Sequence, residues 1–152
     1  MTGDPAAGDA FARQVADALY ARDVTARKLG ITVEAVGLGW SRLAMTVTAD
    51  MVNGHAVAHG GYLFLLADTA MAYASNSHNQ VALAQHAQIT FIAPGKAGET
   101  LTATAREVSR SGRNGLYDID VRGDEGRLIA AFRGATRTVR GQTDPELGDP
   151  PG

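Results

Sequence analysis

The sequence predicts an α+β fold in which one long antiparallel sheet wraps around a single central helix. Residues 60–76 have the length and the Ala, Leu and Met content of a helix, and their apolar side chains lie on every side. Strand-like segments flank this helix, two before it and four after it, with short turn sequences between them. A sheet that curls around such a helix buries it and keeps its own outer face polar.

The segment before the strands is expected to be an amphipathic helix. It starts at Asp9, a plausible N-cap, and stops at Gly30. Apolar residues recur in it at helical spacing, at Phe11, Val15 and Leu19. Residues 31–36 and 40–48 then read as strands joined by the glycine-bearing connection 37–39, which predicts an antiparallel hairpin.

The four strand-like segments after the central helix are separated by turn sequences, and their lengths favour consecutive antiparallel pairing. They span residues 81–93, 99–109, 116–123 and 127–140. This order of elements corresponds to a hot-dog-like layout. Because a single sheet of this kind has an edge strand to protect, we expect it to pair with a second copy of the chain.

The composition bounds the class of protein. The 152 residues predict one domain at 9–140 between flexible ends at 1–8 and 141–152. A net charge of -2 without a basic patch argues against nucleic acid, and the absence of cysteine excludes disulfides and thiolate chemistry. No apolar run reaches the roughly 20 residues of a membrane span, and the start does not resemble a leader peptide. We therefore expect a cytoplasmic protein that does not bind membranes.

Asp68 is the one charged residue within the apolar segment 60–76. It lies about two helical turns after Gly61, so the two share a face, together with Phe64. A carboxylate on an apolar surface is costly unless it is hydrogen-bonded, paired or used in chemistry. Asp68 is therefore either a structural group that bonds backbone amides of a neighbouring loop or a catalytic carboxylate.

The start of the same helix offers a site for a polar substrate group. Gly60 and Gly61 supply backbone N–H groups at the positive end of the helix dipole, where a carbonyl oxygen gaining negative charge is stabilised. A tight turn is the alternative role for the two glycines. His59 orients the loop or the substrate, or is a hydrogen-bonded turn histidine. Asn53 is a turn residue, or its amide holds the attacking water or the carbonyl.

Two further pairs of residues, two histidines and two arginines, have both a structural and a functional interpretation. His55 and His59 are four residues apart, but no cysteine and no obvious third ligand accompany them, so we expect no metal site. Arg110 and Arg113 lie in a turn sequence. They are either the solvated tip of a hairpin or a contact for nucleotide phosphates.

Read together and in order, Asn53, the His-Gly-Gly run 59–61, Phe64 and the segment 66–70 resemble the hot-dog-fold acyl-CoA thioesterases of the phenylacetate-degradation (PaaI) type. The resemblance covers about residues 30–139. It implies hydrolysis of phenylacetyl-CoA, its hydroxylated derivatives or related acyl-CoA to the free acid and coenzyme A. It also implies no cofactor, a homodimer with sites at the interface, and two such dimers joined as a homotetramer.

The same resemblance implies roles for individual residues. The catalytic carboxylate falls on Asp68, as a general base or a nucleophile, and the amide that polarises the carbonyl falls on Gly61. Asn53 is the orienting asparagine and His59 the loop histidine. Some relatives carry Ser or Thr on the strand after the central helix, where this chain has Ala84, so no hydroxyl role is carried over. The remaining substrate-binding candidates are Gly60, Phe64, Thr69, Arg110 and Arg113.

Two other functions remain open for this fold. The first is a non-catalytic acyl-CoA-binding module, although such regulators usually need an output domain and this chain has only a short amino-terminal helix. The second is a hydratase or dehydratase, although the His-Gly-Gly run followed by residues 66–68 looks more like the thioesterase arrangement.

Overall fold

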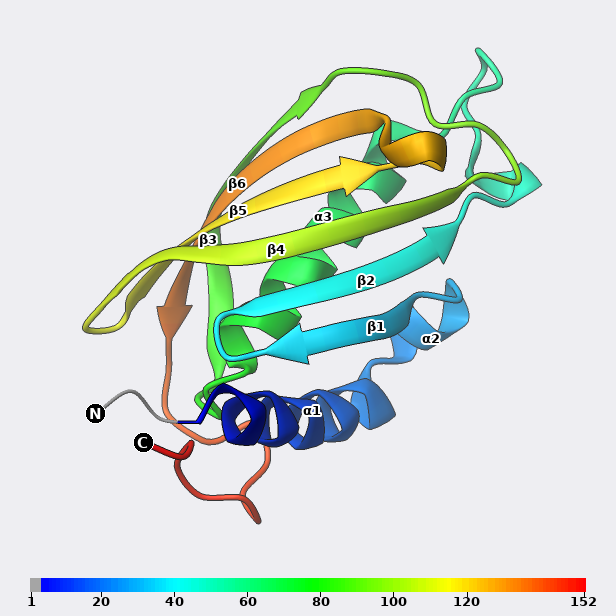
Figure 1. Cartoon of the computed structure of the whole chain (residues 1–152). Coiled ribbons are helices and arrows are strands. Elements are labelled where there is room, and N and C mark those ends of the chain that lie inside the picture. Colours follow the sequence, from blue (N-terminus) through cyan, green and yellow to red (C-terminus); the bar gives the residue numbers. More distant parts are fainter. Residues whose placement is uncertain (1–3) are drawn as a thin grey trace.

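The computed structural model describes residues 4–152 and contains one six-stranded antiparallel sheet that curves around a central helix (Figure 1). The strand order is β1-β2-β4-β5-β6-β3. The predicted α+β architecture is therefore confirmed. The strands are β1 Thr32–Gly37, β2 Trp40–Thr46, β3 Ala82–Phe91, β4 Thr100–Ser111, β5 Asn114–Arg122 and β6 Leu128–Thr138.

The first helix starts earlier than the sequence indicated. Helix α1 (Pro5–Arg22) is capped by Asp4, whose side chain accepts a hydrogen bond from the Ala6 amide at 3.0 Å. Proline fits the first turn of a helix because its missing N–H would be unpaired there anyway. The start expected at Asp9, and the flexible end expected before it, are therefore wrong for residues 5–8. Residues 1–3 of that expected end lie outside the described residues.

A second short helix, α2 (Val24–Lys28), follows α1 directly, a break that the apolar spacing did not reveal. Asp23 ends α1 and also caps α2, because its side chain accepts from the Ala26 amide at 3.0 Å. The stop expected at Gly30 is confirmed, and this glycine has a left-handed φ of 71° that suits it better than other residues.

The hairpin β1–β2 is confirmed, whereas consecutive pairing of the later strands holds only for β4, β5 and β6. β3 pairs with β6 instead, and β4 pairs with β2. Helix α3 lies across the concave face of the sheet, so the strand that follows it closes the far edge (Figure 1). The chain then returns to the centre of the sheet through residues 92–99.

Helix α3 (Gly60–Asn76) has the predicted bounds but is not buried on every side. The sheet covers one side of it. On the remaining sides Gly61 is exposed, Leu65 and Asp68 are only partly buried, and Phe64, at the margin of the sheet, is 37% exposed. The expectation of all-round burial is therefore wrong for a single chain, because the sheet curves around only part of the helix. The fully or nearly fully buried apolar residues of α3 are Leu63, Leu66, Ala67, Ala70, Met71, Tyr73 and Ala74.

The segment after Arg140 has no helix or strand, but part of it is bound to the rest of the fold. Thr143 is buried, and its hydroxyl donates to Asn76 Oδ1 at 2.9 Å. Asn79 Nδ2 donates to the carbonyl oxygens of Asp144 at 2.9 Å and Gly148 at 2.8 Å. Residues 141–148 therefore pack on the turn between α3 and β3, a contact that the expected flexible tail at 141–152 did not include.

A polar cluster attaches the carboxyl-terminal end of α3 to the sheet. Glu107 Oε2 lies 3.0 Å from His78 Nε2 and accepts a hydrogen bond from the Tyr117 hydroxyl at 2.8 Å. The His78 bond, the Tyr117 bond and the positive charge of Arg110 hold the pKa of Glu107 below its ordinary value, although burial opposes this. Since Glu107 lies on β4 and His78 lies just beyond the end of α3, the cluster ties this end of the helix to the sheet.

Glu107→Gln should lower the free energy of unfolding by about 1–3 kcal/mol near neutral pH, because it removes charge-assisted hydrogen bonds in a mostly buried cluster. A lowered folded pKa stabilises the fold above the unfolded value, and this contribution is lost as pH falls through the lowered pKa. The difference between parent and variant should therefore shrink as pH falls below the ordinary value of 4.5. Urea unfolding across this range measures it.

Glu34→Gln is the matched control for this prediction. Glu34 pairs with Arg42 at 3.1 Å, but its side chain is 41% exposed. An exposed pair contributes about 0–1 kcal/mol, so this variant should unfold almost like the parent. Equal losses in the two variants would contradict the anchoring role of Glu107.

Candidate active site

The loop before α3 is closed on itself and bonded to the loop after β3. It contains the 3-10 turn η1 (Ala49–Met51), and the His59 amide donates to the Met51 carbonyl at 2.8 Å. The Ala58 amide donates to the Gly95 carbonyl, also at 2.8 Å. These bonds position the first residues of α3 against residues 92–98.

Asn53 shapes the turn in this loop. Its side-chain oxygen accepts from the His55 amide at 2.9 Å and from the Val57 amide at 3.4 Å. This is the turn role that the Asn-Gly sequence indicated. Its side-chain nitrogen Nδ2 donates to no group within residues 4–152, so the amide retains two donors for a substrate or a water.

The two glycine amides at the start of α3 differ in what they bond. The Gly61 N–H donates to His59 Nδ1 at 3.0 Å, so His59 is the N-cap of the helix. The Gly60 N–H has no acceptor within the described chain 4–152. The free amide at the positive end of the helix is thus that of Gly60, and the Gly61 amide, to which the family resemblance assigned the polarising role, already donates to His59.

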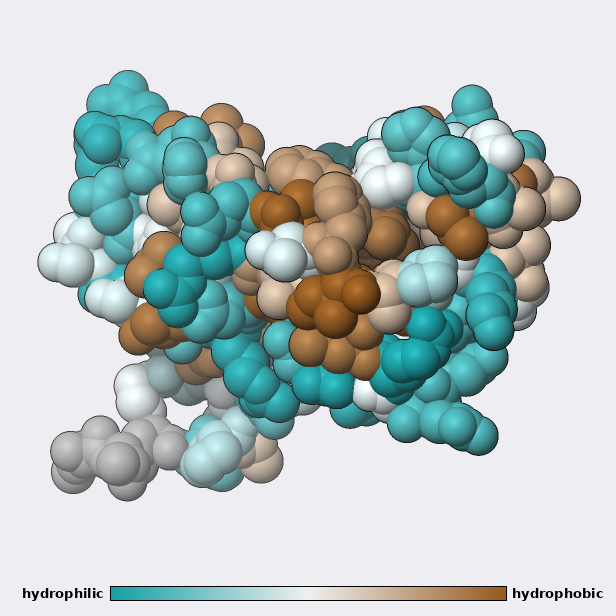
Figure 2. All heavy atoms as spheres, turned by 90° about the horizontal axis from the view of Figure 1, so that it is seen from above, coloured by the Kyte–Doolittle hydropathy of each residue, from teal (hydrophilic) through white to brown (hydrophobic). Residues whose placement is uncertain are grey.

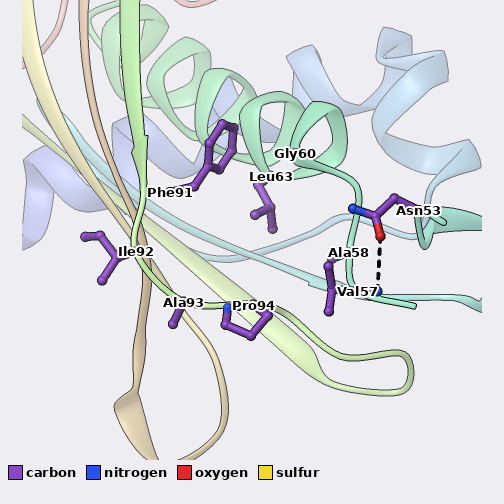
Figure 3. A pocket seen from close by; sticks show the side chains of 9 residues that line it. All are labelled: Asn53, Val57, Ala58, Gly60, Leu63, Phe91, Ile92, Ala93 and Pro94. Carbon is purple, nitrogen blue, oxygen red and sulfur yellow. Dashed lines mark hydrogen bonds between the residues drawn. The ribbon is translucent and has the colours of Figure 1, made fainter. Parts of the chain in front are cut away.

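A cavity of about 420 Å³ opens beside the Gly60 amide and Asn53 (Figure 3). Its remaining lining is apolar and comes from α3, from the end of β3 and from the two flanking loops. Figure 2 shows apolar surface gathered around a hollow in one face of the molecule. The lining side chains besides Asn53 and Gly60 are Val57, Ala58, Leu63, Phe91, Ile92, Ala93 and Pro94.

A buried carboxylate holds one wall of this cavity in place. Glu99 is only 5% exposed and accepts hydrogen bonds from the Lys96 and Asp124 amides, both at 2.9 Å, and from Arg127 at 2.8 Å. These donors outweigh its burial and hold its pKa below the ordinary value. Arg127 also donates to the Pro94 carbonyl at 2.9 Å. The loop that carries Pro94 is therefore tied to the turn between β5 and β6.

Asp68 has no hydrogen-bond partner and no ion pair among residues 4–152, although it is partly buried. Burial raises the pKa of Asp68 above its ordinary value. The structural alternative, a carboxylate that bonds amides of a neighbouring loop, is therefore absent from the described chain. An unpartnered, desolvated carboxylate is the kind of group that catalytic sites use as a base.

Asp68 does not line the cavity next to the Gly60 amide. Leu63 lines that cavity, and five residues along a helix turn the side-chain direction by about 140°. Asp68 thus lies on the outer face of α3, near a second hollow of about 450 Å³ that includes His59, Gly61 and Leu65. A single chain holds the free Gly60 amide and the Asp68 carboxylate on different faces of one helix.

The other candidates occupy varied positions. The Thr69 hydroxyl donates to the Leu65 carbonyl at 2.7 Å, one turn back in its own helix. Phe64 packs edge to face on Phe132, with ring centroids 5.1 Å apart. Ala84 is exposed beside a bulge in β3, outside both cavities.

Arg110 and Arg113 lie at the tip of the β4–β5 hairpin, at the opposite end of the sheet from Gly60 (Figure 1). Arg110 pairs with Gly115 across that hairpin, and its charge acts on Glu107. The structure does not bring these two arginines together with Asn53 or Gly60 in one chain.

Within residues 4–152, His55 and His59 have no third His, Asp or Glu close enough to complete a metal-binding group. In the same part of the chain, no helix has the length and apolar character needed to span a membrane.

The sequence did not single out Leu63, Ile92, Pro94 or Glu99. The sequence also left open whether Phe91 lines a substrate pocket. Apolar residues at strand ends and helix starts look like ordinary core, and only the meeting of β3 with α3 puts them around one cavity. The sequence did contain a signal for Glu99. It is an acidic residue just before a strand whose first residues alternate between apolar and polar types.

A family model described as the thioesterase superfamily matches residues 55–130. The acyl-coenzyme A thioesterase PaaI of Escherichia coli (strain K12) is 45% identical over 128 residues, which cover 84% of this chain and 91% of the relative. A putative esterase of Archaeoglobus fulgidus is 34% identical over 126 residues, 83% of this chain and 82% of the relative.

Solved structures show the same similarity. The E. coli PaaI protein from the phenylacetic acid degradation operon matches with a TM-score of 0.88 at 43% identity, over 89% of this chain and 98% of that chain. A mutant of the phenylacetic acid degradation protein PaaI from Thermus thermophilus matches with a TM-score of 0.72 at 36% identity, over 75% of this chain and 97% of that chain.

Proposed function

This chain belongs to the thioesterase superfamily, and we propose that its acyl-CoA thioesterase activity acts on aryl-acetyl thioesters, phenylacetyl-CoA and its hydroxylated derivatives. Water adds to the thioester carbonyl, the carbon–sulfur bond breaks, and the free acid and coenzyme A leave. The 45% identity to the E. coli acyl-coenzyme A thioesterase, over nearly the whole of both chains, carries the proposal. The unbonded Gly60 amide beside an apolar cavity supports it.

In this proposal the thioester carbonyl accepts a hydrogen bond from the Gly60 N–H. The positive end of the α3 dipole adds to this bond as negative charge develops on the oxygen. Asn53 Nδ2 lies on the same cavity and orients the carbonyl or the water. His59 acts indirectly. Its Nδ1 accepts the Gly61 N–H, and this bond sets the geometry of the first turn of α3.

Asp68 supplies the base that activates water. Its raised pKa makes the carboxylate a stronger base than an exposed aspartate, which suits proton abstraction from water. The pathway through direct attack forms a mixed anhydride between Asp68 and the acyl group. Label from ¹⁸O water in Asp68 after a single turnover demonstrates the anhydride route with attack of water on the Asp68 carbonyl, because general-base catalysis places the label only in the free acid.

A second copy of the chain completes the site. Each chain presents Asp68 on an uncovered helix face and the Gly60 amide in a cavity on another face, so a two-fold pair brings one chain's carboxylate to the other's cavity. The exposed edge strand β3 carries Leu83 at 57% exposure, and an edge strand with an exposed apolar side chain favours pairing. Two such dimers joined as a homotetramer belong to the same proposal.

The remaining parts of the proposal follow from the substrate. Water and a carboxylate suffice for thioester hydrolysis, so no cofactor is needed beyond the coenzyme A of the substrate itself. Arg110 and Arg113 of a neighbouring chain hold the nucleotide phosphates outside the cavity, since arginine suits phosphate geometry. We place the protein in the cytoplasm, as its lack of cysteine favours.

Thiol release from a panel of acyl-CoA substrates tests the proposal. Phenylacetyl-CoA and its ring-hydroxylated forms should give a higher kcat/KM than acetyl-CoA, because the cavity is apolar and larger than a methyl group needs. Binding of every substrate without thiol release would instead support an acyl-CoA-binding module. Hydration of enoyl-CoA without thiol release would support a hydratase.

A further inference from the structure

Phe91 occupies a position for which the proposed mechanism has no use. It is the last residue of β3, paired with Ala130 of β6, and its side chain is 55% exposed in the single chain. A large exposed aromatic side chain at the mouth of a cavity is a candidate for recognition of a ligand.

The ring of Phe91 lies directly against Gly60. A Cβ atom at Gly60 would come within 2.8 Å of Phe91 Cζ, 3.1 Å of Cε1 and 3.4 Å of Cε2. Only a residue without a side chain allows the ring to approach this closely. Gly60 therefore supplies the free amide and, because it has no side chain, also allows the Phe91 ring to lie beside that amide (Figure 3).

The chemistry of the cavity identifies which part of the substrate it takes. No charged side chain lines it, and every lining side chain except that of Asn53 is apolar. The phosphates of coenzyme A would lose hydration there without gaining a cationic partner. The acyl group therefore enters this cavity, and the coenzyme A portion extends away from it.

We propose that Phe91 determines the preference for aromatic over aliphatic acyl groups, an inference that rests on the proposed function. In a phenylacetyl group one methylene joins the ring to the carbonyl. With the carbonyl on the Gly60 amide, this spacing brings the substrate ring to the Phe91 ring within the roughly 4.5–7 Å between centroids that aromatic pairs adopt. A flexible aliphatic chain of similar size fills the cavity without this aromatic contact.

The position of Phe91 is well defined for this role. Its backbone is held in the β3–β6 ladder, and Gly60 limits the ring on one side. Leu63 and Pro94 complete the apolar wall, and the Glu99–Arg127 pair holds the loop that carries Pro94. A ring that is limited on one side loses less conformational entropy when a ligand stacks on it than an unrestricted side chain does.

The test compares kcat/KM for phenylacetyl-CoA and hexanoyl-CoA in the parent, Phe91→Leu and Phe91→Tyr. Leucine keeps the apolar volume but removes the aromatic face, so the ratio of the two kcat/KM values should fall about 2- to 10-fold in Phe91→Leu. Phe91→Tyr keeps the ring and should retain most of the parent ratio. Val108→Leu, on an exposed apolar residue outside the cavity, is the control and should keep the parent ratio.

A ratio that stays unchanged in Phe91→Leu overturns the inference, whether the two kcat/KM values keep the parent level or fall in parallel. Partial loss of folding lowers both values by the same factor, so the ratio still reports on the folded enzyme, and thermal unfolding of each variant measures that loss. Absence of thiol release from the parent with either substrate would be a failure of the proposed function instead. In that case calorimetric affinities for the same two thioesters replace kcat/KM, and an unchanged affinity ratio in Phe91→Leu still overturns the role of Phe91.

Discussion

Asp68→Asn should lower kcat for phenylacetyl-CoA hydrolysis by on the order of 10² to 10⁴, with a smaller effect on substrate affinity. Asparagine has nearly the same shape as aspartate but cannot accept a proton from water. Because the Asp68 carboxylate has no partner within residues 4–152, its loss breaks no hydrogen bond of the described chain. Thiol release under saturating substrate measures the effect.

The same substitution should leave the protein at least as stable as the parent. Burial raises the folded pKa of Asp68, so its contribution to stability is complete below the ordinary value and is lost as pH rises through the raised pKa. Near neutral pH the parent therefore holds a charge that the fold disfavours, and the variant does not. Unfolding midpoints check this, and a large loss of stability together with the loss of activity would point to a structural role.

Gly60→Pro should lower kcat by about 10² to 10³ relative to Gly60→Ala, because proline removes the N–H that polarises the carbonyl. Proline suits this position, since Gly60 is the first residue of α3 and has no left-handed φ. His59 before it has φ -61° and ψ 133°, a conformation that a following proline favours. Thiol release measures both variants.

Gly60→Ala is the matched control, because its Cβ meets the Phe91 ring as the proline Cβ does while its N–H remains. Equal kcat in the two variants would return the polarising role to another amide, with Gly61 as the first candidate.

The proline variant also tests whether each active site is shared between two chains. In a mixture with Asp68→Asn, half of the dimers combine the two chains and one of their two sites is intact, so about a quarter of the parent activity should return.

Much of the fold was predictable because local signals agreed with the tertiary structure. The α3 segment combined strong helix formers with a histidine cap, and its bounds were predicted as the structure has them. The resemblance to PaaI-type acyl-CoA thioesterases is confirmed by the family match and by the E. coli relative. The start of α1 was misplaced because the apolar spacing begins later than the Asp4 cap does.

The pairing of the strands was less predictable. The turn sequences between strands indicate hairpins, and β4, β5 and β6 follow them. β3 does not, because its partner depends on where α3 leaves the concave face and not on the length of the next loop. Strand pairing between segments distant in sequence leaves no local pattern to detect.

The order and spacing of residues were enough to indicate the thioesterase family, the central helix and an unusual carboxylate at Asp68, because these features depend on neighbours along the chain. They were not enough to decide which of the two adjacent amides, that of Gly60 or that of Gly61, stays free. His59 Nδ1 accepts a hydrogen bond from the Gly61 N–H, so the Gly60 N–H stays free. Phe91, which is distant in sequence, packs against Gly60. Hydrogen-bond directions and contacts between remote segments exist only once the chain is folded, and so the tertiary structure decided which glycine faces the cavity and which side chain forms its wall.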